Sequence, residues 1–298
     1  MIPLVSIIVA TYRREKELDR AVSSALSQSY PNIEVIVVDD NDDTEWNKKV
    51  ETIIKKKQKE SETTLQLIQN HPNIGSARTR NNGIEACKGE YVVFLDDDDL
   101  FLQDRVNNQI NEMLKTDADF GITDLILYNE DESINETRKR DYLKSEEGNN
   151  LLLCHLKYHL TGTDTLMFKK SYLTLIGGFD PIDSGDEYYL MMKAILKGGK
   201  LSYLPKCDVK AYVHTGDGGL SSGTRKIVGE NKLYEYKQQF FSKLRIKDRS
   251  YIKMRHFAVL AFAYLRMKNL FGFFSNGIRG FLASPIGCIK LIVGRKAL

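Results

Sequence analysis

The stretch Tyr91-Val92-Val93-Phe94-Leu95-Asp96-Asp97-Asp98-Asp99 decides the fold predicted for this chain. Its first five residues are apolar or aromatic and rich in β-formers, which predicts a buried strand. The four carboxylates must then lie where this strand leaves the core. Because neighbouring carboxylates repel one another, a divalent cation such as Mg²⁺ or Mn²⁺ would stabilise the run. The alternative is a solvated acidic turn or a helix N-terminus, where Asp is also favoured.

Strands and helices alternate ahead of this stretch. Apolar runs predict strands, and apolar residues at helical spacing predict the helices between them. The predicted strands are 5–10, 33–38 and 65–68, and the predicted helices are 14–28, 47–60 and 75–86. This order predicts an α/β fold with a mostly parallel sheet flanked by helices.

The second half of the chain is less regular. We expect further strands at 165–168 and 201–204 and a helix over 186–197. Residues 124–150 are charged and show no clear period, so we expect a surface loop or an excursion toward a second substrate.

Three predicted strands end in polar residues. Strand 5–10 leads into Thr11-Tyr12-Arg13, strand 33–38 leads into Asp39-Asp40-Asn41, and the strand from Tyr91 leads into the aspartates. Parallel α/β sheets bind ligands at the carboxyl ends of their strands, so we expect these three segments to face one site.

An ordered set of short motifs resembles glycosyltransferase family 2, whose members have the Rossmann-like GT-A fold. The set spans roughly residues 4 to 205, and no single motif in it is specific. The matching segments are 5–12, 37–41, Gly75 with 80–84, 89–99, Gly177-Gly178-Phe179-Asp180 and 186–190. The resemblance implies that a sugar moves from a nucleotide-sugar, such as a UDP-sugar, to an acceptor hydroxyl with inversion at the anomeric carbon.

The resemblance also implies a divalent cation, Mn²⁺ or Mg²⁺, which would stabilise the charge of the departing nucleoside diphosphate. The family's Asp-x-Asp motif matches Asp96-Asp97-Asp98, so Asp98 is the first candidate ligand and Asp96 its partner, with Asp96 and Asp97 also near the nucleotide-sugar. A register shifted to 97–99 stays open. His214 is a further candidate ligand, and its alternative is a structural or surface histidine.

By the same resemblance, Asp39 would accept a hydrogen bond from the nucleotide base, and Ala10 and Tyr12 would line that base. Thr11, between them, is a further candidate for nucleotide-sugar binding. The alternative for Asp39 is a cap on the following turn.

The predicted donor site also includes three residues from the segment that precedes the strand at Tyr91. Arg80 and Asn81 could bind the diphosphate or the donor sugar, and the alternative is that they support the neighbouring loops. Gly75 would allow the backbone to approach the donor closely.

Inverting transfer needs a base that accepts the acceptor proton. The family places an acid at the start of the helix that follows Gly-Gly-Phe-Asp, and here the pair is Asp186-Glu187. The register favours Glu187 as the base, although the family usually has Asp there, and Asp186 is the competing candidate. Capping of the helix N-terminus is the structural alternative for both.

The C-terminal segment 251–298 is basic and partly apolar. It holds no Asp or Glu, and its apolar runs include 257–265 and 270–274. Its basic residues are Lys253, Arg255, Arg266, Lys268, Arg279, Lys290, Arg295 and Lys296. This composition predicts helices that contact anionic lipid, or else helices that pack on the catalytic domain or on a dimer partner. We therefore expect a catalytic domain over 1–225 and a helical appendage over 226–298.

Other function classes fit less well. A nucleotidyltransferase usually has a Gly-rich phosphate loop after its first strand, whereas 10–14 contains no glycine. A non-catalytic sugar-nucleotide-binding module predicts a lost metal or base position, yet Asp96, Asp98 and Glu187 all keep carboxylates. A net charge of +3 without an RNA-binding motif argues against nucleic acid as a partner.

The expected partners are a nucleotide-sugar, a glycan or lipid-linked acceptor and a membrane surface. No basic and apolar leader precedes strand 5–10, and no apolar run reaches the ~18 residues of a transmembrane helix. The four cysteines are far apart and predict reduced thiols. We expect a cytoplasmic protein that binds peripherally to the inner face of the cell membrane.

Overall fold

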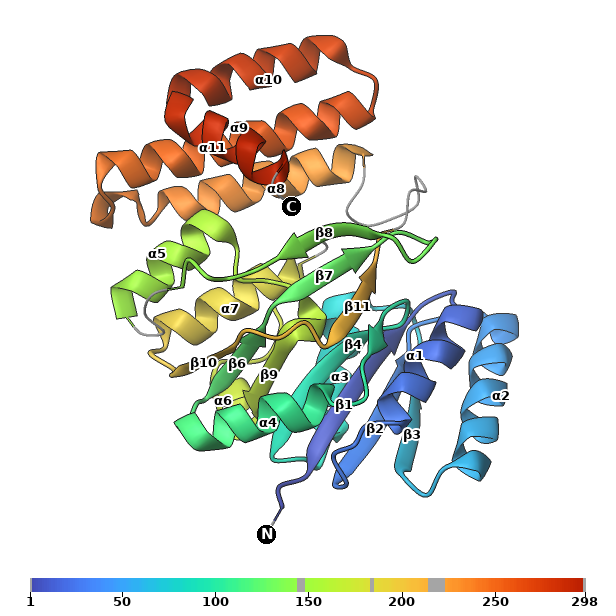
Figure 1. Cartoon of the computed structure of the whole chain (residues 1–298). Helices are drawn as coiled ribbons and strands as arrows, with labels where there is room; N and C mark the ends of the chain where they lie inside the picture. Colours follow the sequence, from blue (N-terminus) through green and yellow to red (C-terminus); the bar gives the residue numbers. More distant parts are fainter. Residues whose placement is uncertain (1, 144–147, 183–184, 214–222, 297–298) are drawn as a thin grey trace. The chain divides into compact units, whose positions relative to one another are not determined.

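The chain forms two compact units (Figure 1). The structure is a computed structural model and describes residues 2–143, 148–182, 185–213 and 223–296. The sheet unit comprises Met1–Leu152, Leu160–Ile182 and Asp186–Val213, and the helical unit comprises Leu153–His159, Asp183–Gly185 and His214–Leu298. The predicted domain boundary between residues 225 and 226 stays a prediction.

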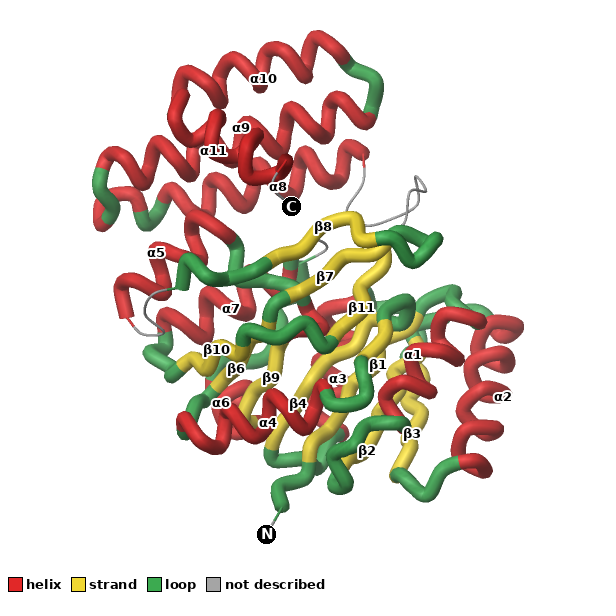
Figure 2. Tube along the Cα trace, in the orientation of Figure 1, coloured by secondary structure: helices red, strands yellow, loops and turns green. Residues whose placement is uncertain are grey.

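The sheet unit is built on a seven-stranded sheet in the order β10-β6-β9-β4-β1-β2-β3 (Figure 2). All neighbours run parallel except β9, which is antiparallel to β4 and β6. The strands are β1 (Val5–Thr11), β2 (Ile33–Asp39), β3 (Thr64–Gln69), β4 (Tyr91–Asp96), β6 (Phe120–Thr123), β9 (Leu166–Lys169) and β10 (Leu201–Leu204). The predicted α/β fold with a mostly parallel sheet is confirmed.

The central strands carry apolar residues on both faces, and both faces are buried because helices cover the sheet on each side. On one face α1, α2 and α4 pack against alternate residues such as Ile7 and Val35. On the other, α3 lies so close to β1 that a Cβ added at Gly83 would be 2.5 Å from Ile8 Cγ2. The helices of the sheet unit are α1 (Lys16–Leu26), α2 (Thr44–Glu60), α3 (Ser76–Ala86), α4 (Arg105–Thr116), α6 (Lys170–Leu175) and α7 (Asp186–Leu196).

A second, four-stranded sheet has the order β5-β11-β7-β8. Its strands are β5 (Leu100–Phe101), β7 (Leu125–Tyr128), β8 (Ile134–Arg138) and β11 (Val209–Tyr212). The expectation of an irregular segment over 124–150 was therefore wrong for β7 and β8. The reason is that β8 is an edge strand with mostly polar residues, so its composition resembles that of a loop.

The helical unit contains α8 (Gly223–Gln238), α9 (Ile246–Arg266), α10 (Leu270–Ala283) and α11 (Pro285–Lys296). Helix α9 packs between α8 and α10, and α11 also contacts α9 and α10 (Figure 1). Helix α5 (Gly148–Tyr158) divides between the two units. In the described residues, no helix is both long enough and apolar enough to cross a membrane.

Candidate active site

The carboxyl ends of β1, β2 and β4 meet at one edge of the large sheet, as predicted. In the parallel register Thr11 lies beside Asp39, and Ala10 lies beside Asp96. The end of β1 is thus flanked by one aspartate from each neighbouring strand. This is the edge at which open α/β sheets bind ligands.

Arg80 joins this edge to the start of α7. Its Nη2 donates to Asp96 Oδ1 at 2.6 Å, and its Nη1 donates to Asp186 Oδ2 at 2.9 Å. Burial of the guanidinium opposes its charge, but the two carboxylates more than offset this and raise the pKa of Arg80. Arg80 therefore brings a predicted metal ligand and the predicted base region into one site.

Glu187 lies next to this ion-pair network and is half-buried. Burial first, and then the neighbouring carboxylate of Asp186, raise the pKa of Glu187 to about 8. Asp186 is committed on both oxygens, since Oδ2 accepts from Arg80 and Oδ1 accepts from the Glu187 N–H at 3.0 Å. Glu187 is thus the carboxylate whose proton affinity suits a base near neutral pH.

The four aspartates that begin with the last residue of β4 form a tight turn, in which the Asp99 N–H donates to the Asp96 carbonyl at 3.1 Å. The two corner residues point to the end of β1. Asp97 accepts from the Thr11 hydroxyl at 2.8 Å and from the Tyr12 N–H at 3.1 Å, and Asp98 pairs with Arg14 Nη2 at 2.8 Å. Burial and the charge of Asp98 raise the pKa of Asp97 to about 7.

The two residues that flank the turn meet a third carboxylate, Asp164, which sequence reasoning missed. One carboxylate oxygen from each of Asp96, Asp99 and Asp164 lies within 4.8 Å of the others. The Asp96 N–H donates to Asp164 Oδ1 at 2.6 Å, and the Tyr212 N–H donates to Asp99 Oδ1 at 2.8 Å. Asp164 comes from η1 (Thr163–Thr165), a short turn whose sequence carries no recognisable motif.

This buried group of carboxylates is one candidate site for a divalent cation. Burial and the neighbouring carboxylates raise the pKa of both Asp99 and Asp164, so their negative charge is destabilised without a counter-ion. Hard cations prefer oxygen ligands and would relieve this repulsion. The predicted ligand Asp96 belongs to the group, whereas Asp98 is paired with Arg14, and His214 lies outside the described residues.

The residues predicted for the nucleotide base lie at the ends of β1 and β2. Asp39 is fully buried, and its carboxylate accepts from the Asn41 N–H at 2.9 Å, the Asn41 amide at 2.7 Å and the Gln69 amide at 3.3 Å. The first contact is the local turn expected for the alternative role of Asp39. Tyr12 is 48% exposed, and the Arg13 guanidinium lies over its ring at 5.3 Å from the ring centroid.

Gly75 is held by Asp40, the residue after β2. Asp40 Oδ2 accepts from the Gly75 N–H at 2.9 Å, and Oδ1 accepts from the Ile74 N–H at 2.9 Å. Gly75 has a φ of +83° immediately before α3, and a Cβ added to it would have no atom within 4 Å. Position 75 thus requires glycine because its φ is positive, and not because a side chain there would collide with other atoms.

A family model described as "Glycosyl transferase family 2" matches residues 6–175, which hold all of the strand-end residues described above. The chain belongs to glycosyltransferase family 2.

Proteins named as glycosyltransferases are similar to the whole or to part of this region. An uncharacterized glycosyltransferase of Haemophilus influenzae is 30% identical over 229 residues, covering 75% of this chain and 84% of the relative. The Escherichia coli protein WfaP, named UDP-Glc:alpha-D-GlcNAc-diphosphoundecaprenol beta-1,3-glucosyltransferase, is 41% identical over 112 residues, covering 37% of this chain and 41% of WfaP.

The fold of this family 2 glycosyltransferase is also similar to that of a solved enzyme of the GT-A fold. The mannosyltransferase PcManGT of Pyrobaculum calidifontis, solved with GDP-Man and Mn²⁺, matches with a TM-score of 0.57 and 18% identity. The match covers 99% of this chain and 80% of PcManGT, and at this identity it supports the fold alone.

Asn81 of the glycosyltransferase clamps the turn that precedes α7. Its Nδ2 donates to the Phe179 carbonyl at 2.8 Å, and the Phe179 N–H donates to Asn81 Oδ1 at 2.8 Å. Gly178 has a φ of +59°, and a Cβ added to it would be 2.6 Å from Asn81 Oδ1. This geometry matches the loop-supporting alternative for Asn81.

We expect Asn81→Ala to lower the free energy of unfolding by about 1–3 kcal/mol, because it removes both hydrogen bonds to the Phe179 backbone. The turnover number should fall with it, since the turn leads to the acidic start of α7, while the dissociation constant of the donor changes less. Thermal unfolding and steady-state kinetics would measure both. Asn111→Ala is the control, because Asn111 is exposed and its amide donates to the Asn107 side chain, one turn away on the same helix, at 3.3 Å. A changed donor affinity with an unchanged melting temperature would instead indicate donor binding.

Proposed function

We propose that the chain transfers a sugar from a nucleotide-sugar, a UDP-sugar, to a hydroxyl of a lipid-linked glycan, with inversion and with the help of a divalent cation. The observation that carries the proposal is the Arg80 bridge from Asp96 to Asp186, because it joins carboxylates suited to a cation with the acidic start of α7. A site with both parts can stabilise a leaving diphosphate and deprotonate an acceptor.

In this proposal the acceptor hydroxyl lies against Glu187, whose carboxylate takes the proton as the hydroxyl oxygen attacks the anomeric carbon. The raised pKa of Glu187 makes it a stronger base than an exposed glutamate. Asp186 positions Arg80, and Arg80 in turn fixes Asp96. The nucleotide base packs near Tyr12 and Asp39, at the far side of β1 from Asp96.

A divalent cation, when bound, would supply positive charge at the departing diphosphate. Asp96 would hold it together with Asp98, whose side chains are 33% and 19% exposed and so accessible to a nucleotide arriving from solvent. As whole residues, Asp99 and Asp164 are only 6% and 4% exposed, and in this proposal they stabilise the turn.

One comparison supports a lipid-linked acceptor. WfaP, as its name states, acts on a sugar attached to diphosphoundecaprenol, and it is similar to this chain in sequence over 112 residues. A lipid-linked acceptor would require the enzyme to work at a membrane surface. The proposal therefore includes a peripheral location at the membrane.

The direct test is a screen of UDP-Glc, UDP-GlcNAc and GDP-Man with Mn²⁺ or Mg²⁺, read by melting temperature and by slow hydrolysis of the donor. A ligand at a hundredfold excess over its dissociation constant adds about 2.7 kcal/mol, which should raise the melting temperature by about 5–10 °C. ATP with the same metals is the control. If no nucleotide-sugar gives a shift or hydrolysis with either metal, the proposal fails.

A further inference from the structure

Helix α10 buries its small residues against helix α9. The buried positions are Gly272, Asn276 and Gly280, which recur every four residues and so form one stripe of the helix. A Cβ added at Gly272 would be 2.5 Å from the Tyr264 ring, and one at Gly280 would be 3.4 Å from Phe257 Cβ. The glycines thus allow α10 to lie close against α9.

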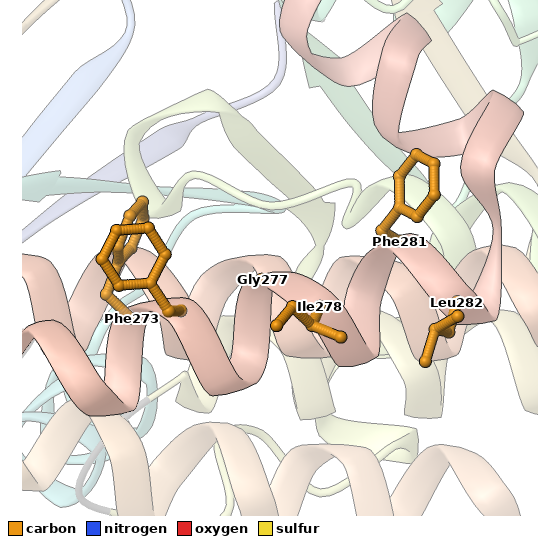
Figure 3. Close-up of a pocket in the computed structure, with 6 residues that line it drawn as sticks. Phe273, Gly277, Ile278, Phe281 and Leu282 are labelled. Atoms are coloured by element: carbon orange, nitrogen blue, oxygen red, sulfur yellow. The ribbon is translucent and has the colours of Figure 1, made fainter.

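The opposite side of α10 presents its large apolar residues to solvent. Figure 3 shows residues of α10, among them Ile278, Phe281 and Leu282, that line a hollow. The volume of this hollow is about 300 Å³. Phe271 is 86% exposed and Leu282 is 74% exposed. We define the α10 face as the exposed residues Phe271, Phe274, Ile278, Phe281 and Leu282 of α10 and Ile286 and Ile289 of α11. Surface helices of soluble proteins normally bury their large apolar residues and expose polar ones. An exposed apolar face of this kind indicates a binding surface.

The charged residues from position 251 onward, the segment that carries the α10 face, have one sign. Exposed cations lie on α9, on the connection to α10, on the flank of α10 and on α11, and no Asp or Glu occurs from residue 251 onward. These cations are Lys253, Arg266, Lys268, Arg279 and Lys290. An apolar strip edged by cations matches the interface of an anionic bilayer, where acyl chains lie beneath phosphate groups.

We propose that the α10 face inserts into the interfacial region of an anionic membrane while the edging cations contact lipid phosphates. A second copy of this chain is a poorer partner, because a symmetric dimer would place the same cations against one another without an acid in the segment to offset them. The membrane contact is also more specific than the sequence indicated, since in the apolar run 257–265 Leu260, Ala261 and Ala263 are buried within the helical unit.

The test is flotation of the full chain with vesicles. Wild type should float with phosphatidylcholine–phosphatidylglycerol vesicles and much less with phosphatidylcholine alone. The double variant Phe271→Ser/Leu282→Ser should lose most of this binding, and Lys268→Gln/Lys290→Gln should weaken it roughly fivefold for each cation removed. Matched controls are Leu175→Ser, at a site 61% exposed on α6, and Lys56→Gln/Lys59→Gln on α2, all of which should bind like wild type.

Binding that is unchanged in Phe271→Ser/Leu282→Ser would overturn the proposal, as would equal flotation on neutral vesicles. So would a wild-type dimer, measured by light scattering, that the same variant converts to a monomer, because the face would then bind a second copy. Each variant substitutes exposed residues, and its melting temperature would confirm that it folds. Donor hydrolysis in solution is a separate readout, so loss of flotation with intact hydrolysis leaves the proposed transferase function standing.

Discussion

Replacing Glu187 with glutamine is expected to lower the turnover number by about 10²–10⁴-fold while leaving the dissociation constant of the nucleotide-sugar nearly unchanged. The amide keeps the size of the side chain and cannot accept the acceptor proton. Isothermal titration with the donor and single-turnover transfer would separate the two effects. Glu62→Gln, an exposed glutamate on the sheet unit, is the control. Unchanged turnover in Glu187→Gln would remove Glu187 from the reaction.

The pH dependence gives the same prediction an independent readout. A base must be deprotonated to act, and burial together with Asp186 raises the pKa of Glu187 to about 8. The value of kcat/KM should therefore rise with pH toward about 8, well above the titration of an ordinary glutamate. Asp186→Asn removes the neighbouring negative charge, so it should move this profile to lower pH as well as lower the rate.

Stability should respond in the opposite direction to activity. Between about pH 4.5 and 8, folded Glu187 keeps a proton that the unfolded chain has lost, so this residue destabilises the folded protein increasingly as the pH rises. Glu187→Gln removes that cost. Its melting temperature should exceed that of wild type by the largest margin at about pH 8 and above, and by the smallest below about pH 4.5.

Hydrophobic patterning was sufficient to predict the strands that build the site. The runs in β1, β2 and β4 are long, continuous and rich in β-branched residues, and their polar ends could belong only at the edge of the sheet. The parallel order then required Thr11, Asp39 and Asp96 to be neighbours, and the register confirms it.

The parts that could not be predicted depend on contacts distant in sequence. Asp164 binds the Asp96 N–H across 68 positions, and the turn that presents it carries no periodicity. Arg80 and Asn81 are adjacent on α3, yet one bridges two carboxylates and the other clamps a backbone turn. Residue type alone allowed both roles for both residues, and only the placement of α7 separates them.

Which of the four aspartates lie together also depends on the three-dimensional structure and could not be predicted from the sequence. A tight turn brings its first and last residues together, so Asp96 and Asp99 share one side, while the corners Asp97 and Asp98 face Thr11 and Arg14. Four identical letters cannot reveal this division. It also sets two candidate cation sites against each other, because Asp96 can bind with Asp98 at the accessible side or with the buried Asp99 and Asp164.

The aspartate variants should separate these two sites. We expect Asp96→Asn and Asp98→Asn each to raise the dissociation constant of Mn²⁺ at least about tenfold, a loss of about 1.4 kcal/mol, and to abolish the Mn²⁺-dependent rise in melting temperature with a nucleotide-sugar. Asp164→Asn should retain Mn²⁺ binding, because Asp164 is 4% exposed and its Oδ1 already accepts from the Asp96 backbone. Electron paramagnetic resonance of free Mn²⁺ would measure the binding directly. The opposite pattern, with Mn²⁺ binding lost in Asp164→Asn and kept in Asp98→Asn, would place the cation among the buried carboxylates instead. In that arrangement Asp98 would act only as the ion-pair partner of Arg14.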